Sequence, residues 1–170
     1  MLIFKRLLAF TIDYAVIICY GVLLFGASTF ITSNFDINIE KIHPFKAQTI
    51  SFITLTIPTF LYFYLSEISN KKASIGKRVM KLFVESDTLE SRKNSVLKRN
   101  ILKFLPWEIA HTGIHWMNYY GFENPNIPVW IWIIIITSEV IAVIYLVSIF
   151  YYKGSKSVYD SLSKTIVTIN

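Results

Sequence analysis

The sequence predicts an all-α protein: a polytopic transmembrane bundle of four helices with both termini on the cytoplasmic side, plus a candidate two-stranded β element at the cytoplasmic face. Three observations predict it. Of the 170 residues, 54% are hydrophobic and 16% are charged, whereas soluble domains average about 45–50% and about 25%. The charges are bunched, so that long apolar stretches separate them. The basic residues also fall mostly on one predicted side of a membrane.

Three stretches have the length of a membrane-spanning helix, which needs about 20 mostly apolar residues. Residues 7–31 hold one charged residue, Asp13, residues 47–66 hold none, and residues 129–152 hold only Glu139. A helix on the surface of a soluble core would show a polar face, which these stretches lack. We therefore expect three transmembrane helices over these ranges.

A cleavable signal peptide is the alternative for the first stretch. Lys5 and Arg6 are typical of the basic start of such a peptide, and residues 26–28 are typical of a cleavage site. The apolar core of a signal peptide is about 7–15 residues long. The stretch here is longer and contains an acidic residue, which favours a retained helix.

Residues 99–117 are a fourth, weaker candidate. This segment contains Lys103 and Glu108, and Pro106 interrupts it. Hydropathy alone predicts an interfacial helix. The distribution of Lys and Arg predicts a crossing instead, because positively charged loops stay on the cytoplasmic side.

Lys and Arg total 17: two precede the first helix, two lie between the first and second, ten lie in residues 67–103, none lies in residues 117–128, and three follow the last helix. With the first, third and last of these segments inside, 15 of the 17 are cytoplasmic. The segment 99–117 must then cross or re-enter the membrane. We expect one domain over residues 1–170, with a cytoplasmic loop at 67–98, in the inner membrane of a prokaryote.

The net charge of +6 and the isoelectric point near 9.4 indicate contact with anionic lipid headgroups rather than with nucleic acid. The basic residues flank membrane segments, and no nucleic-acid motif is present. Gly76 and Lys77 do not begin a phosphate-binding loop, because Lys71 and Arg78 stand where that motif has glycine and Ser or Thr. No nucleophile is spaced with a base, so we expect neither an enzyme nor a cofactor or metal site.

Two short segments have the composition of strands. Residues 78–85 alternate partly between apolar and charged side chains, and residues 165–169 read Thr-Ile-Val-Thr-Ile. Both segments are predicted to lie on the cytoplasmic face. We therefore expect them to pair with each other there.

Ionisable side chains inside apolar segments are candidate functional residues, because a charge at a helix centre costs about 2.5–3.5 kcal/mol. Arg6 and Asp13 are seven residues apart, which places them on one helix face about 10 Å apart along the axis. Arg6 can reach the headgroups, whereas Asp13 needs a cation, a proton or water. Asp13 is therefore either an ion or proton ligand, or a structural anchor for a neighbouring helix or the cytoplasmic loop.

Glu108, His111 and His115 are a second candidate group, because their spacing places them on one helix face. Histidine titrates near neutral pH, which favours a proton relay. One alternative is a metal site with Asp13 and Glu139, but the second Glu-x-x-His motif of such sites is missing. The other alternative is a polar seam between helices. We expect Glu139 to be protonated, or paired with His111, His115 or a lysine.

Four motifs then occur in order along the chain: Arg6 with Asp13 in the first helix, Gly76-Lys77-Arg78 in the loop, Arg99-Asn100 before the third helix, and Asp160 with Thr165 and Val167 in the tail. In this order and over the whole chain they resemble the RDD family of small membrane proteins, named for an arginine and two aspartates. Ser74 stands where the family usually has threonine, and Tyr159 where histidine is common.

The resemblance implies that Arg6, Asp13 and Asp160 are the defining residues, and that ion transport is an activity suggested for some members. Arg6 and Asp160 would meet at the cytoplasmic surface, with Asp13 just below them and with Arg78 and Arg99 joining. Two hypotheses follow. The first is an oligomeric transporter of monovalent cations or protons. The second is a non-transporting scaffold or assembly factor that binds partners through its basic loop.

Overall fold

The computed structural model describes residues 1–35, 42–86, 92–122 and 126–169, so residues 87–91 of the predicted cytoplasmic loop 67–98 lie outside the described residues. In chain order the elements are α1 (Leu2–Asn34), α2 (Pro44–Ser51), the π-helix η1 (Phe52–Thr56), α3 (Ile57–Ile68), α4 (Ile75–Val79), β1 (Leu82–Ser86), α5 (Arg92–Tyr120), α6 (Val129–Tyr151), α7 (Val158–Leu162) and β2 (Thr165–Ile169).

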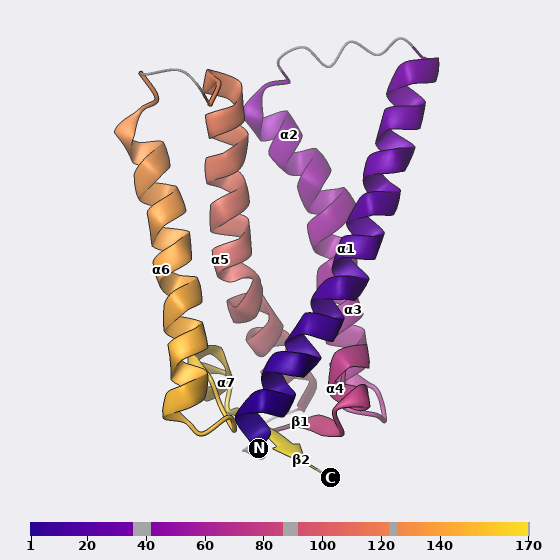
Figure 1. Cartoon of the computed structure of the whole chain (residues 1–170), viewed down its shortest axis with the longest axis vertical. Helices are drawn as coiled ribbons and strands as arrows, with labels where there is room; N and C mark the ends of the chain where they lie inside the picture. Colours follow the sequence, from indigo (N-terminus) through magenta and orange to yellow (C-terminus); the bar gives the residue numbers. More distant parts are fainter. Residues whose placement is uncertain (36–41, 87–91, 123–125, 170) are drawn as a thin grey trace.

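The long helices run along the length of the molecule, and both termini lie at the same end, which we call the terminal end (Figure 1). The short elements α4, β1, α7 and β2 also gather there. At the opposite end α5 lies beside α6, and α2, which leads into α3, contacts α5. The two ends of the chain and the short elements therefore meet at the terminal end.

Three helical stretches are long and apolar enough to cross a membrane: Leu2–Asn34, Pro44–Ile68 and Val129–Tyr151. They correspond to the three stretches expected from hydropathy. The helix α5 is also long, with 29 residues, but it is much more polar. It begins at Arg92 rather than near residue 99, so part of the predicted loop 67–98 is helical. Hydropathy locates only the apolar part of a helix. The polar first turns of α5 extend the helix beyond that part because water or other side chains satisfy their polar groups.

The strands β1 and β2 pair antiparallel, with Val84 opposite Val167, which confirms the predicted pairing. Leu82, Val84 and Val167 are buried, and Leu82 and Val167 pack with Ala9 of α1. The small sheet therefore fixes the tail of the chain beneath the start of the first helix.

The π-helix η1 precedes Pro58, near the start of α3. Proline has no N–H, so Pro58 cannot donate a hydrogen bond to the carbonyl of Thr54, four residues earlier. That carbonyl accepts a hydrogen bond from the hydroxyl of Tyr20 on α1, at 2.6 Å. A neighbouring helix thus replaces the missing backbone donor.

The same solution recurs in α5, where Pro106 lies inside the helix. Pro106 leaves the carbonyl of Leu102 without its usual donor. The hydroxyl of Tyr145 on α6 donates to that carbonyl at 3.1 Å. Each interruption in a long helix is therefore joined to the helix beside it.

Candidate functional site

Arg6 and Asp160 form a buried ion pair between the first helix and α7. Arg6 is only 5% exposed, and Asp160 is fully buried. Arg6 also donates to the carbonyl of Gly154 at 3.1 Å and to the hydroxyl of Tyr159 at 3.2 Å. Its guanidinium therefore holds the tail of the chain against α1.

Asp160 is shared between two arginines. Arg99 of α5 donates through Nε to Asp160 Oδ1 at 2.6 Å, while Arg6 bonds the other carboxylate oxygen. Asp160 also accepts from the backbone N–H and hydroxyl of Ser157, which forms a capping box at the start of α7. This carboxylate links α1, α5 and α7.

Charge explains why Asp160 stays ionised in a buried place. Burial alone would raise the pKa of its carboxyl group, but the charges of Arg99 and Arg6 and their hydrogen bonds hold the pKa below its usual value. The group is thus a permanent anion at neutral pH. Loss of Asp160 would leave the buried guanidinium of Arg6 without its carboxylate partner, and that of Arg99 with Glu67 alone.

Glu67, at the end of α3, is the second shared carboxylate. It accepts from Arg99 Nη1 at 2.5 Å, from Lys77 Nζ at 2.6 Å and from Asn100 Nδ2 at 3.0 Å. All four side chains are buried. Glu67 therefore joins α3, α4 and α5, and Arg99 connects it to Asp160.

Asp13 contacts the start of α4, as expected for a structural anchor. Its carboxylate accepts from the hydroxyl of Tyr62 at 2.7 Å, from the hydroxyl of Ser74 at 2.6 Å and from the backbone N–H of Gly76 at 2.8 Å. The first N–H groups of a helix lack partners within the helix. Asp13 supplies one, so its contacts have the geometry of a helix cap contributed by another helix.

Gly76 allows this contact because it has no side chain. A Cβ atom built there would overlap the carbonyl oxygen of Ala9 and lie 3.0 Å from Asp13 Cγ. The short helix α4 therefore lies directly on the backbone of α1. Lys77, the next residue, lies 3.5 Å from the Ser74 hydroxyl and connects the Asp13 contacts with Glu67.

The structure brings most of the residues expected at this end into one network. Arg6 contacts Asp160, and Arg99 and Asn100 join through Asp160 and Glu67. Arg78 does not join them, contrary to expectation: its side chain is exposed and donates to the carbonyl of Ala73 at 2.9 Å. Gly76 and Lys77 lie on the face of α4 that packs toward α1 and α3. Arg78, the next residue, therefore points away from that face.

Glu67 is the member of this network that sequence reasoning missed. It lies just beyond an apolar stretch, in a segment rich in Lys and Arg, where an acid reads as an ordinary loop residue. The signal that could have found it is its position within one turn of a membrane-length apolar segment.

A second polar cluster surrounds Glu108, deeper along α5. Glu108 accepts from Gln48 Nε2 at 3.0 Å and from the hydroxyl of Thr56 at 2.5 Å. The indole N–H of Trp107 donates to Thr56 Oγ1 at 3.3 Å. Gln48 Oε1 is buried without a hydrogen-bond partner among the described residues. The carboxylate therefore has neutral donors around it, beside a free amide oxygen.

The histidines continue this cluster along α5. His115 Nε2 lies 2.9 Å from the hydroxyl of Ser51, and His111 Nδ1 lies 3.0 Å from the carbonyl of Trp107. The two imidazole rings are 6.1 Å apart. Glu108, His111 and His115 thus occupy one side of the helix, facing α2 and η1.

Of the two alternatives expected for Glu139, pairing with His111, His115 or a lysine is not found among the described residues. It is exposed on α6 and makes no hydrogen bond or ion pair within the described residues. The neighbouring Ser138 is the residue that turns inward, and its hydroxyl donates to the carbonyl of Ile135. The rotation of α6 places Glu139 one residue away from its buried face.

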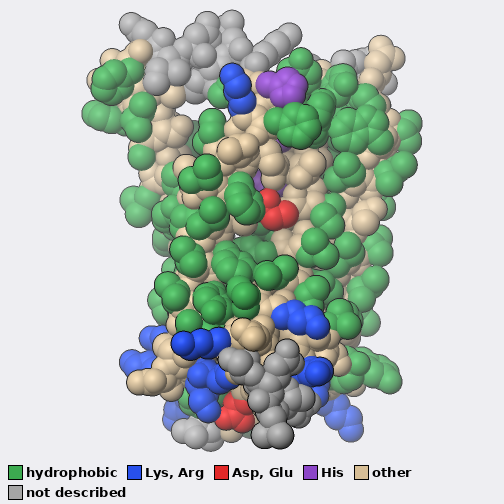
Figure 2. Space-filling model, turned by 180° about the vertical axis from the view of Figure 1, so that it is seen from behind, with side chains coloured by type: hydrophobic (Ala, Val, Ile, Leu, Met, Phe, Trp, Pro, Cys, Tyr) green, Lys and Arg blue, Asp and Glu red, His purple; other side chains and the backbone are tan. Residues whose placement is uncertain are grey.

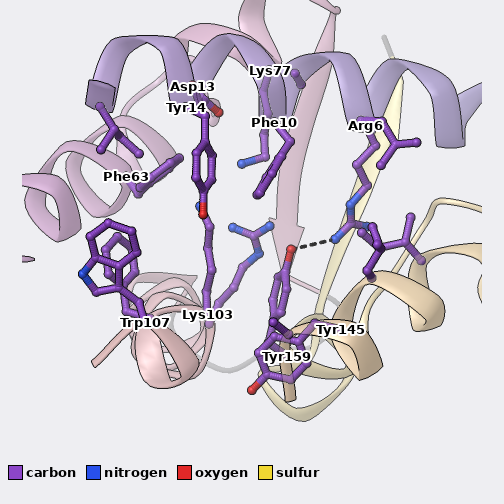
Figure 3. A pocket seen from close by; sticks show the side chains of 18 of the residues that line it. Arg6, Phe10, Asp13, Tyr14, Phe63, Lys77, Lys103, Trp107, Tyr145 and Tyr159 are labelled. Carbon is purple, nitrogen blue, oxygen red and sulfur yellow. Dashed lines mark hydrogen bonds between the residues drawn. The ribbon is translucent and has the colours of Figure 1, made fainter. Parts of the chain in front are cut away.

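A cavity of about 200 Å³ lies between α1, α3, α5 and α6, next to the terminal-end network (Figure 3). In Figure 3, Phe10 and Tyr14 point into it from α1, and Lys103 points into it from α5. Asp13 lines this cavity, but Glu108, His111, His115 and Glu139 are not among its lining residues. The candidate ion ligands therefore do not share one chamber.

Three helical stretches that are long and apolar enough to cross a membrane indicate a membrane protein. The model of the RDD family matches residues 2–164, nearly the whole chain. The chain therefore belongs to the RDD family. Neither the curated proteins nor the solved structures compared with it gave a match.

Proposed function

We propose that the protein crosses the inner membrane of a prokaryote four times, with both termini in the cytoplasm. Two observations support this topology. The helix α5 runs from the terminal end to the opposite end beside α6 (Figure 1). Most Lys and Arg side chains gather at the terminal end, while apolar side chains cover the middle (Figure 2). Loops rich in basic residues remain cytoplasmic.

Within this topology, we propose that the protein exchanges protons with monovalent cations and performs no enzymatic reaction. The observation that carries the proposal is the environment of Glu108. It is nine residues beyond Arg99 on α5, hence about 13 Å deeper along the helix axis. In an apolar medium a carboxylate without a counter-charge binds a proton or a cation.

The neighbours of Glu108 fit both ligands. The free Gln48 Oε1 and the Thr56 hydroxyl add oxygen atoms of the kind that hard cations prefer. The imidazole groups of His111 and His115 lie along the same face, and imidazole is a common proton carrier in proteins. A proton and a cation would therefore compete for one carboxylate, which is the requirement for exchange.

The helix facing Glu108 is interrupted, which also supports transport. The α2–η1–α3 column contains a π-helix at Phe52–Thr56, and Thr56 is the residue that bonds Glu108. Segments of π-helix occur frequently at functional sites.

We further propose that the working unit is an oligomer of this chain. Four helices enclose little space for a transport path. Glu139 is exposed on a helix that carries no other charged residue, and an acidic side chain facing lipid is costly. A second copy of α6 would give Glu139 a polar partner away from lipid.

Reconstitution in vesicles that contain a pH-sensitive dye tests transport. We expect imposed Na⁺, Li⁺ or K⁺ gradients to drive proton movement in vesicles with the protein, but not in empty vesicles. If none of the three gradients moves protons, the transport proposal is wrong.

The alternative function is a non-transporting scaffold that binds partners through its basic terminal end. The observation that favours it is the exposed basic surface there, which includes Lys71, Arg78 and Lys98. A scaffold predicts that Asp13→Asn lowers protein abundance or complex formation without changing any ion flux. It also predicts a partner in mild-detergent purification, so a bare homomer would count against it.

A further inference from the structure

The cavity next to the terminal-end network has a polar end and an apolar remainder. Its apolar wall includes Phe10, Ile17, Phe104, Trp107, Ala142 and Leu146. Along α1 the lining extends from Arg6 to Ile17, which is about 16 Å of helix. Such a shape suits a molecule with a charged head and a hydrocarbon tail.

The polar end of the cavity is basic. Four basic side chains line it, Arg6, Lys77, Arg99 and Lys103, whereas Asp13 is the acidic residue among the lining. Glu67 and Asp160 already bond the first three of these cations from outside the cavity. Four basic groups therefore face three carboxylates.

Lys103 is the basic side chain left over. Within the described residues, its Nζ forms no hydrogen bond or ion pair and lies over the ring of Phe63, 3.0 Å from the ring centroid. A face-on aromatic contact is a weaker partner than a carboxylate or phosphate. Lys103 thus has all three N–H donors available to a ligand in the cavity.

Thr59 provides a second, independent free donor. It lines the same cavity from α3, is 5% exposed, and its hydroxyl has no hydrogen-bond partner among the described residues. A buried hydroxyl without a partner costs free energy. A ligand that accepts hydrogen bonds from both Thr59 and Lys103 would remove that cost.

We propose that this cavity binds an anionic glycerophospholipid, with its phosphate group on Lys103 and Thr59 and the start of its acyl chain along the apolar wall. Basic pockets between membrane helices on the cytoplasmic side suit anionic headgroups. Phe10 is 52% exposed and Leu146 is 48% exposed, so the rim on α1 and α6 is open for the rest of the chain to leave toward the bilayer.

The test compares lipid retention by full-length protein extracted from nanodiscs that contain equal amounts of phosphatidylglycerol and phosphatidylcholine. Native mass spectrometry should show that the wild type retains phosphatidylglycerol preferentially. Lys103→Met should reduce this retention about tenfold, because it removes a charge-assisted hydrogen bond. Thr59→Val should reduce it less. Lys98→Met is the matched control, because Lys98 is an exposed lysine of the same helix, and it should retain lipid like the wild type.

Thr59→Val keeps the shape and charge of the site, so it carries the test if Lys103→Met does not fold. Equal retention of both lipids by the wild type would overturn the proposal, as would equal effects of Lys103→Met and Lys98→Met. A further arm measures thermal stability with added inorganic phosphate. We expect that phosphate alone does not raise the unfolding temperature. If phosphate raises it as much as phosphatidylglycerol does, the site binds a soluble anion instead.

Discussion

The hydroxyl of Tyr145 on α6 donates a hydrogen bond to the carbonyl oxygen of Leu102 on α5, at 3.1 Å. That carbonyl is the one that Pro106 leaves without a backbone donor. A buried carbonyl without a partner is costly in an apolar environment. The proline therefore creates a specific point of attachment between two adjacent helices.

A double-mutant cycle tests this attachment. Tyr145→Phe should lower the free energy of unfolding by about 1 kcal/mol in the wild type, because the Leu102 carbonyl loses its partner. In a Pro106→Ala background, the restored backbone N–H can bond that carbonyl, so Tyr145→Phe should have less effect. Thermal unfolding in detergent measures both. Equal effects in the two backgrounds would show that the hydroxyl does not compensate for the proline.

Replacement of Gly76 tests the close contact between α4 and α1. Gly76→Ala would push a Cβ atom into the carbonyl oxygen of Ala9, and we expect it to lower the free energy of unfolding by about 2 kcal/mol. Gly21→Ala, on the same helix as Ala9 with nothing within 4 Å, is the control and should not destabilise the protein. Similar unfolding temperatures for the two variants would contradict the contact.

Asp160 should make stability depend on acid pH. Its pKa is lower in the folded protein than the usual 3.8, first because of Arg99 and then of Arg6, which outweigh the effect of burial. The stabilisation is therefore present above pH 3.8 and is lost as the pH falls through the lower folded-state value. We expect Asp160→Asn to cost about 3–5 kcal/mol at neutral pH.

Unfolding temperatures of the wild type and Asp160→Asn, followed from neutral to acid pH, measure this dependence. The difference between the two proteins should shrink as the carboxyl group of the wild type becomes protonated. Glu85→Gln serves as the control, since Glu85 forms a half-exposed pair with Lys72 at 3.4 Å, and such pairs contribute little. A difference that persists unchanged in acid would contradict the assigned charge of Asp160.

The sequence predicted the elements whose signal is local. Apolar length was enough for the three long helices. Partial alternation and composition indicated the paired strands β1 and β2, but residues 78–79 of the predicted first strand belong to α4 and β1 begins at Leu82. The meeting of Arg6 with Asp160 was implied by family resemblance and not by spacing. Spacing within one helix says nothing about which distant segment supplies a partner.

What the sequence left open depends on helix rotation and on contacts between helices. The exposure of Glu139 depends on how α6 is turned, and an apolar sequence on all sides does not specify that rotation. Glu108 was predicted as a candidate, but its partners Gln48 and Thr56 lie more than 50 positions earlier in the chain. The free donors of Thr59 and Lys103 become visible only when a cavity is present beside them.

The oligomer proposal predicts an effect of Glu139. If a second copy covers this side chain, Glu139→Leu should shift the protein toward the monomer, because a polar contact between copies is lost. The mass of the protein in mild detergent measures this shift. Val143→Leu is the control, because Val143 is an exposed apolar residue on the same helix. An unchanged mass distribution for Glu139→Leu would place Glu139 outside any interface.

The most direct test of Glu108 measures proton movement driven by a Na⁺ gradient in vesicles. It compares the wild type with Glu108→Gln and Glu85→Gln at equal protein content. Glutamine keeps the size of the side chain but cannot bind and release a proton. The account predicts movement with the wild type and with Glu85→Gln, and a loss of at least about tenfold with Glu108→Gln. Equal movement by the wild type and Glu108→Gln would contradict it.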